Sequence, residues 1–176
     1  QGFLLLEDLG VHTYLHVIDA GNADAMFDVA LRELVKLQSI PVPAGFPAYD
    51  RALLLRELRL FDEWFLGVHL GLALDDGERA ALAGVYDVLA DAALAQPQVL
   101  VHRDYMPRNL MPCADEVAIL DFQDAVRGPI GYDAACLFKD AFLSWPEARV
   151  AGWHARYREL AAHAGAHVTQ LVGGHA

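Results

Sequence analysis

Three oxygen-bearing side chains stand close together in the sequence, and their types and spacing could serve a divalent cation. Asp104 and Asn109 are five residues apart on one segment, and Asp121 follows the next apolar run. Carboxylate and carboxamide oxygens suit Mg²⁺, which takes one or two carboxylates together with phosphate oxygens. A carboxylate beside such a cation can orient a hydroxyl group and accept its proton. Taken singly, Asp and Asn are also common turn residues; the combination of all three favours chemistry.

Two short apolar runs must position these side chains. Residues 99–101 lead into His102-Arg103-Asp104, and residues 117–120 lead into Asp121. Between them lies a stretch with Pro107 and Pro112, which predicts a loop. We therefore expect two short strands in a hairpin-like element with polar residues at its rims.

The rest of the chain is predicted to be mainly helical. Apolar side chains recur at helical spacing, and Asp75 or Asp76 can cap one of the helices. On the helix near residue 60, the spacing predicts that Phe61 and Phe65 point inward. A four-residue apolar run at 3–6 predicts a buried strand that ends in a turn. The predicted helices span residues 22–38, 50–66, 77–95, 133–144 and 147–164.

Composition excludes several classes of protein. The chain has 176 residues, 55% of them hydrophobic, and a net charge of −11, so one folded domain is expected. This acidic balance argues against binding to nucleic acids and to anionic membranes, which need a basic face. No apolar run is long enough to span a membrane. Two cysteines, Cys113 and Cys136, cannot form a disulfide framework, so we expect a reducing compartment, the cytoplasm.

The segment His102-Arg103-Asp104, with Asn109 five residues after the aspartate and Asp121-Phe122 after the next strand, resembles the catalytic and metal loops of protein-kinase-like phosphotransferases. The local sequence is most similar to the aminoglycoside phosphotransferase/choline kinase family. In that family the Asp-Phe pair need not be followed by glycine, and in this chain Gln123 follows it. Residues 128–133 look like the segment after the metal loop in that family. Residues 4–10 look like its hinge.

The resemblance implies a role for each matching residue. Asp104 would be the catalytic base that orients the acceptor hydroxyl, and Asn109 and Asp121 would hold Mg²⁺ against the phosphates of ATP. Glu7 and Leu9 would offer hinge backbone groups to the adenine ring. The implied cofactors are therefore ATP and Mg²⁺, and Asp133 would brace the catalytic loop.

Sequence patterns that are less specific than the catalytic motif indicate the substrate. Residues 49–58 and 61–65 look like those of the bacterial sugar kinases of cell-wall recycling within the same family. That resemblance implies phosphorylation of an N-acetylated amino sugar such as N-acetylmuramate, with Glu57, Glu63 and Trp64 as a substrate wall. The alternative for these three residues is a solvated, charged helix face with one packed aromatic side chain.

The implied fold is α+β and protein-kinase-like, mainly the helical C-terminal lobe with a short catalytic-loop hairpin. Residues 1–10 would be the hinge and the end of the N-terminal lobe, and residues 11–176 the C-terminal lobe. No glycine-rich loop follows a strand, and the only lysines, Lys36 and Lys139, fall on predicted helices. We therefore expect the N-terminal lobe to be missing, with weak nucleotide binding and little turnover by this chain alone.

Two other functions fit the same residues. An aminoglycoside (antibiotic) phosphotransferase would suit the acidic chain, because aminoglycosides are cationic. A non-catalytic, kinase-like binding module would explain a missing lobe. A module that has lost catalysis, however, has no chemical need to keep Asp104, Asn109 and Asp121 together. In the enzymatic readings the partner is a small-molecule substrate.

Overall fold

The strands form two separate antiparallel ribbons in the computed structural model, which describes residues 3, 5 and 7–165. Strand β1 (Gln98–Val101) pairs with β4 (Val126–Pro129), and β2 (Leu110–Cys113) pairs with β3 (Glu116–Ile119). The β2–β3 ribbon closes through a two-residue turn.

The predicted pairing of residues 99–101 with 117–120 is wrong. The first run pairs with β4, and the second pairs with β2, in the stretch predicted to be a loop. β2 contains Pro112, whose missing N–H is tolerated in a two-stranded ribbon where one strand edge is free. β4 reads Val-Arg-Gly-Pro, which carries no strand signal in the sequence. Gly128 is needed there, because a Cβ atom at this position would lie 3.1 Å from the Cβ of Tyr49.

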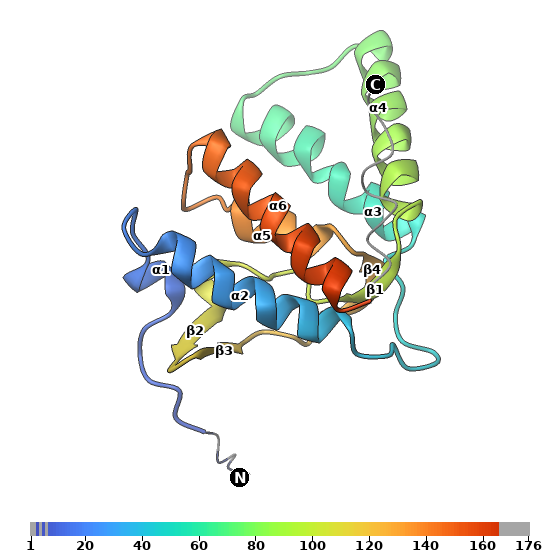
Figure 1. The fold of residues 1–176 in the computed structure, drawn as a ribbon. Coiled ribbons are helices and arrows are strands. Elements are labelled where there is room, and N and C mark those ends of the chain that lie inside the picture. The colour runs from blue at the N-terminus through green and yellow to red at the C-terminus, as the bar shows by residue number, and fades with distance from the viewer. Residues whose placement is uncertain (1–2, 4, 6, 166–176) are drawn as a thin grey trace.

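Three helices enclose the main apolar core. Figure 1 shows α2 (Ala23–Gln38) beside α6 (Glu147–His163), with α5 (Tyr132–Phe138) packed behind them. The two long helices match the predicted ranges within two residues, because each buries one apolar face. The largest fully buried side chains of this core include Phe27, Leu31, Leu34, Tyr105, Leu110, Ile130, Leu137 and Phe138.

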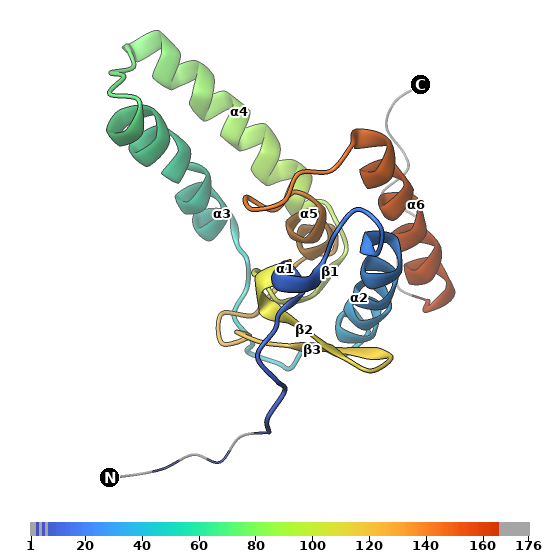
Figure 2. The ribbon, with the colours of Figure 1, turned by 90° about the vertical axis from the view of Figure 1, so that its left-hand side faces the viewer.

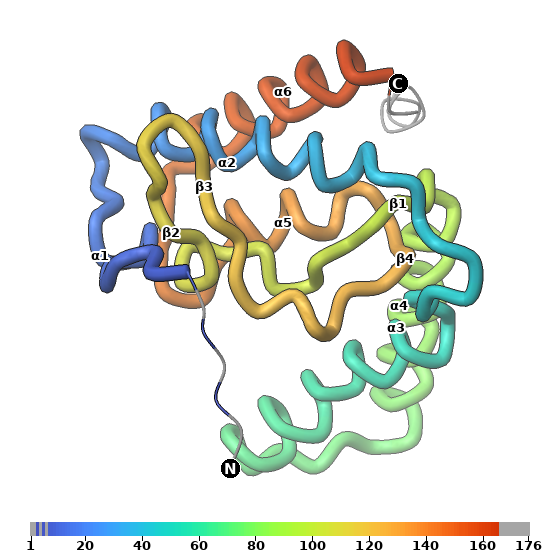
Figure 3. The backbone as a smooth tube through the Cα atoms, turned by 90° about the horizontal axis from the view of Figure 1, so that it is seen from below, coloured from blue at the N-terminus to red at the C-terminus, as the bar shows by residue number. Residues whose placement is uncertain are grey.

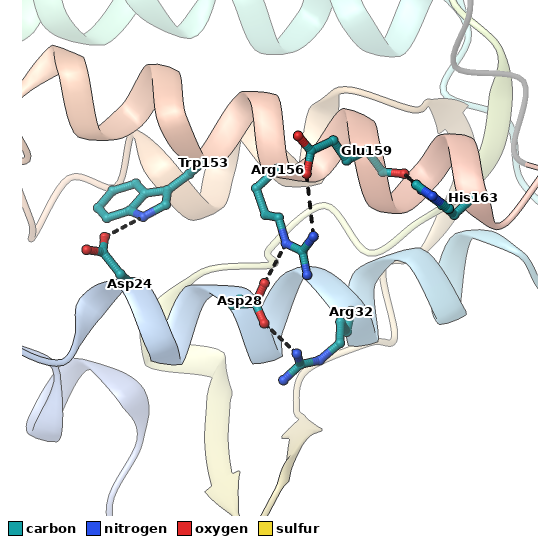
Figure 4. Close-up of polar contacts among 7 residues, drawn as sticks. All are labelled: Asp24, Asp28, Arg32, Trp153, Arg156, Glu159 and His163. Atoms are coloured by element: carbon teal, nitrogen blue, oxygen red, sulfur yellow. Dashed lines mark hydrogen bonds and ion pairs between the residues drawn. The ribbon is translucent and has the colours of Figure 1, made fainter.

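A polar seam runs along the contact between α2 and α6 (Figure 4). The Trp153 indole N–H donates to Asp24 at 2.8 Å, and Arg156 donates to Asp28 at 2.7 Å. Exposed ion pairs of this kind contribute at most about 1 kcal/mol each. The seam therefore sets the alignment of the two helices, while the buried apolar side chains hold them together.

Helix α5 is shorter than predicted. It ends at Phe138, whereas the sequence pattern extends to residue 144. The Asp140 carboxylate accepts the backbone N–H of Phe142 at 3.0 Å, and such a local side-chain bond competes with helical hydrogen bonding.

A helical arm projects from the body of the molecule. It consists of α3 (Arg51–Leu58), the π-helix η1 (Phe61–His69) and α4 (Asp76–Leu94), and Figure 2 shows it standing away from α2 and α6. Asp50 and Asp75 cap α3 and α4 through bonds to the backbone N–H groups three residues on. Seen from below in Figure 3, the strands and α5 lie between the arm and α2.

The arm differs from the prediction in two respects. The expected single helix over 50–66 is divided, because α3 ends at Leu58 and η1 follows with a wider turn. The expected inward orientation of Phe61 and Phe65 is wrong, since each side chain is 47% exposed. Their rings stack on each other at a centroid distance of 5.4 Å, and Asp62, which accepts from Tyr86 at 2.8 Å, faces α4 instead.

Near the N-terminus, α1 (Tyr14–Val17) contacts the 3₁₀ turn η2 (Pro107–Asn109) and β2. The predicted strand at 3–6 lies partly outside the described residues, because Leu4 and Leu6 are not among them. Phe3 and Leu5 belong to no strand and are fully or almost fully exposed, so the expected burial is wrong for these two. No helix in the described part of the chain is both long and apolar enough to cross a membrane.

Candidate active site

The loop that carries Asp104 is closed by hydrogen bonds to that residue's own carbonyl oxygen. The Met106 N–H and the Asn109 side-chain Nδ2 both donate to it at 2.9 Å. Asn109 is buried and holds the loop from within, while the Asp104 side chain is partly exposed. Because Nδ2 faces the loop, the carboxamide oxygen of Asn109 is the atom that remains for a cation.

A second contact joins the loop to Asp121. The Leu120 N–H donates to the Asn109 carbonyl oxygen at 2.9 Å, and Asp121 follows directly. Asp121 has a left-handed backbone (φ 67°), and its Oδ1 accepts the Gln123 side-chain amide at 2.8 Å. Aspartate tolerates this conformation better than most residues. The structure therefore places the backbone of Asp121 next to that of Asn109, with Asp121 exposed to solvent.

Asp133 binds the backbone of the loop that bears Asp104. Its two carboxylate oxygens accept the backbone N–H groups of His102 and Arg103 at 2.8 and 2.9 Å. Burial raises the pKa of Asp133 to about 7, although the two backbone bonds act in the opposite direction. Arg103 has a φ of 77°, which is costly for a residue with a Cβ atom. The bonds to Asp133 fix this turn at the residue before Asp104.

His102 lies under the loop and packs edge-on against Tyr105 at a ring-centroid distance of 6.0 Å. Burial lowers the pKa of His102; the Leu120 backbone and the carboxylates of Asp104 and Asp121 act in the opposite direction. His102 also borders an apolar hollow of about 500 Å³ with Leu100 and Phe122.

The donor set at this place fits Mg²⁺. Among the described residues there is no group of three His, Cys, Asp or Glu side chains arranged around a common point. That rules out a cage made of such side chains there, as structural Zn²⁺ would require. One carboxylate and one carboxamide oxygen, from Asp121 and Asn109, suit a cation that keeps water and binds phosphate oxygens.

Several residues of the site have no local signal in the sequence. Tyr105 is fully buried, and its hydroxyl donates to the Ala30 carbonyl oxygen at 2.7 Å, which anchors the loop on α2. Arg103, to which the sequence assigned no role, pairs with Glu57 of α3. Only the folded chain joins these partners, because each pair is separated by more than 40 residues.

The remaining predicted site residues are not brought to Asp104. Glu7 and Leu9 lie on the N-terminal segment, which Figure 2 shows extending away from the helices, with Glu7 exposed. Glu63 and Trp64 lie on η1, and Trp64 is 61% exposed. Glu57 contacts the loop that bears Asp104 through the side chain of Arg103. A role of these residues in adenine or substrate binding stays a prediction.

Comparison with known proteins identifies the class to which this fold and site belong. The chain belongs to the phosphotransferase enzyme family, whose profile matches residues 1–170. It is 56% identical over 165 residues to an N-acetylmuramate/N-acetylglucosamine kinase of Pseudomonas putida and 52% identical to the kinase of the same name from Pseudomonas aeruginosa. The match covers 94% of this chain and 49% of each relative, so the chain spans about half the length of these curated relatives.

Solved structures support the kinase-like α+β fold. The gentamicin complex of the phosphotransferase APH(2″)-IIa aligns with a TM-score of 0.58 at 17% identity, over 89% of this chain and 56% of that one. ADP-bound aminoglycoside phosphotransferase APH(2″)-Ib aligns with a TM-score of 0.56 at 18% identity, over 92% and 61%. At such identities the likeness concerns the fold alone.

Proposed function

We propose that this chain carries the catalytic and metal loops of an ATP-dependent phosphotransferase that acts on a hydroxyl group of an N-acetylated amino sugar. One observation supports this most directly: the Leu120–Asn109 backbone bond, which sets Asp121 beside the loop that bears Asp104. The names of the relatives at 56% and 52% identity support the choice of sugar.

In this proposal each residue has one task. Asp104 orients the acceptor hydroxyl and accepts its proton, while the hydroxyl oxygen forms a bond to the γ-phosphorus and the bond to the β–γ bridging oxygen breaks, releasing ADP. The Asn109 carboxamide oxygen and the Asp121 carboxylate would hold Mg²⁺. Bound there, Mg²⁺ would neutralise phosphate charge. Asp133 keeps the loop in its left-handed turn throughout.

The outer parts of the site follow the family resemblance. Glu7 and Leu9 would meet the adenine ring as a hinge within residues 1–10, and residues 11–176 would be the C-terminal lobe. Glu63 and Trp64 would form the substrate wall on the arm, where exposed aromatic faces are available. Glu57 of α3 belongs to the same predicted wall, but its carboxylate is already bound by Arg103. We place the reaction in the cytoplasm, where free thiols such as Cys113 and Cys136 persist.

A second candidate is phosphorylation of an aminoglycoside. It is favoured by the net charge of −11, which would attract a polycationic acceptor, and by the fold shared with APH(2″)-IIa. The 56% identity to a sugar kinase outweighs a likeness at 17% identity. A non-catalytic binding module is the third candidate, and it would show no turnover with or without the Asp104 carboxylate.

The test is ADP release from MgATP with N-acetylmuramate, N-acetylglucosamine, kanamycin and choline as acceptors. We expect release with one or both amino sugars and none above background with kanamycin or choline. Release with kanamycin alone would establish the antibiotic phosphotransferase instead. Because little turnover is expected from this chain alone, release with no acceptor would leave both an incomplete catalyst and the binding module standing.

A further inference from the structure

Both carboxylate oxygens of Glu57 are engaged. The Arg103 guanidinium donates to Oε1, and the Tyr49 hydroxyl donates to Oε2. The Arg103 and Glu57 side chains are only 21% and 22% exposed, so water screens the pair less than it screens ion pairs elsewhere on the surface. Glu57 is therefore occupied by groups of its own chain.

Arg103 connects three parts of the molecule. Its side chain reaches Glu57 on α3 and the carbonyl oxygen of Asp124 after the metal loop at 3.4 Å, and it lies over the Tyr49 ring at 5.7 Å. Its backbone N–H is bound to Asp133. Arg103 is thus held twice: its backbone N–H is bound by Asp133, and its guanidinium is bound by Glu57.

The charge of Arg103 needs such a partner. Arg103 follows β1 by two positions, and the carboxylate of Asp104 is its direct neighbour along the chain. Burial of the guanidinium lowers the pKa of Arg103, but Glu57 more than offsets this, so that pKa lies above its ordinary value. Among the described residues, Glu57 is the one carboxylate paired with the Arg103 guanidinium, so its removal would leave this charge without an anionic partner beside the loop.

We propose that Glu57 is a positioning residue, which keeps the Arg103 guanidinium bound to α3 and away from Asp104 and Asp121, so that the catalytic loop retains its working geometry. This inference rests on the proposed function. It gives Glu57 a task within the chain in place of a contact with substrate, and it makes the base of the helical arm part of the catalytic loop's support.

Another pair on the same helix offers a matched control. Arg51 of α3 pairs with Asp87 and Asp91 of α4, more exposed to solvent and without contact to the catalytic loop. A general need for ion pairs in the arm would make Arg51 and Glu57 equally sensitive. A positioning role predicts that substitutions of Glu57 or Arg103 slow the chemical step, whereas substitution of Arg51 does not.

The first experiment compares steady-state kinetics of Glu57→Gln, Glu57→Asp, Arg103→Gln and the double variant Glu57→Gln/Arg103→Gln with Arg51→Gln. Because a shift of about 1 Å at a catalytic group can cost ~100-fold in rate, we expect Glu57→Gln to lower kcat about 10- to 100-fold, with both KM values changing less than about threefold. Glu57→Asp should recover part of kcat, and the double variant should be no slower than the worse single variant. A raised sugar KM with unchanged kcat would overturn the proposal, because it would mark Glu57 as a substrate contact. Equal losses in Arg51→Gln would overturn it too.

The second experiment does not depend on turnover. Exchange of the backbone amide protons of His102 and Arg103 reports whether the loop stays bound to Asp133. We expect Glu57→Gln to accelerate exchange at Arg103 about tenfold or more, while α2 amides and the Arg51→Gln protein show wild-type rates. Unchanged exchange at Arg103 would overturn the proposal. Wild-type protein without phosphotransferase activity would show that this chain alone is not a sufficient catalyst, and the exchange result would still decide whether Glu57 holds the loop.

Discussion

The carboxylate of Asp133 accepts the backbone N–H groups of His102 and Arg103, one on each oxygen, at 2.8 and 2.9 Å. This bidentate contact joins the start of α5 to the residues just before Asp104, 30 positions away. It satisfies two N–H groups that the left-handed turn at Arg103 removes from regular hydrogen bonding. Burying a carboxyl group is costly, and here its two hydrogen bonds fix the backbone of the loop that bears Asp104.

Replacing Asp133 by asparagine should destabilise the protein. The change puts an amide N–H₂ group against one of the two backbone donors, and an unsatisfied buried polar group costs about 1–3 kcal/mol. Urea denaturation of Asp133→Asn at pH 5 should show a loss of this size. A variant as stable as the wild type would mean that the two bonds contribute nothing to the folded state.

The same variant predicts a pH effect. The pKa of Asp133 is raised from its ordinary 3.8 to about 7 by burial, so the folded state holds a proton that the unfolded state releases. The stability that this proton contributes is fully present below pH 3.8 and is lost as the pH rises towards 7. The stability advantage of wild type over Asp133→Asn should therefore shrink between pH 5 and pH 7.5. An advantage that grows with pH would contradict the raised pKa.

Asp121→Asn should weaken binding of nucleotide in the presence of Mg²⁺. Asparagine keeps the left-handed backbone but removes the charge, and loss of a metal-site group commonly costs about 10- to 100-fold in metal affinity. Titration calorimetry with ATP, with and without Mg²⁺, measures the effect. Asp115→Asn, in the β2–β3 turn, is the matched control for the change in net charge. An equal benefit from Mg²⁺ in wild type and Asp121→Asn would remove Asp121 from the cation site.

Tyr105→Phe should reduce stability with little change in shape. The variant deletes one buried hydroxyl that donates to the Ala30 carbonyl oxygen, and a hydrogen bond of this kind contributes about 0.5–1.5 kcal/mol. The midpoint of urea denaturation should fall accordingly, while the slope stays the same. A higher midpoint would show that the Tyr105 hydroxyl destabilises the folded protein.

The sequence placed Asp121 directly after a short apolar strand, and the structure has β3 there, but the partner of that strand is β2, which the sequence predicted to be a loop. The long helices were predictable as well, since the apolar stripe of α2 and the Asp75 cap of α4 are local signals. The strand pairing was not, because β4 contains Arg-Gly-Pro and finds its partner only across the fold. Nor was the link between Glu57 and Arg103, which are 46 residues apart and share no periodic pattern.

The measurement that tests the central claim most directly compares wild type with Asp104→Ala in phosphoryl transfer from MgATP to N-acetylmuramate. Proton acceptance by a positioned carboxylate contributes about 10²- to 10⁴-fold to a rate, so kcat should fall by that factor. The circular dichroism and the denaturation midpoint should stay close to wild type, because the side chain is partly exposed and has no part in the apolar core. Phosphorylated sugar formed at the wild-type rate by folded Asp104→Ala would contradict the assignment of Asp104 and the mechanism built on it.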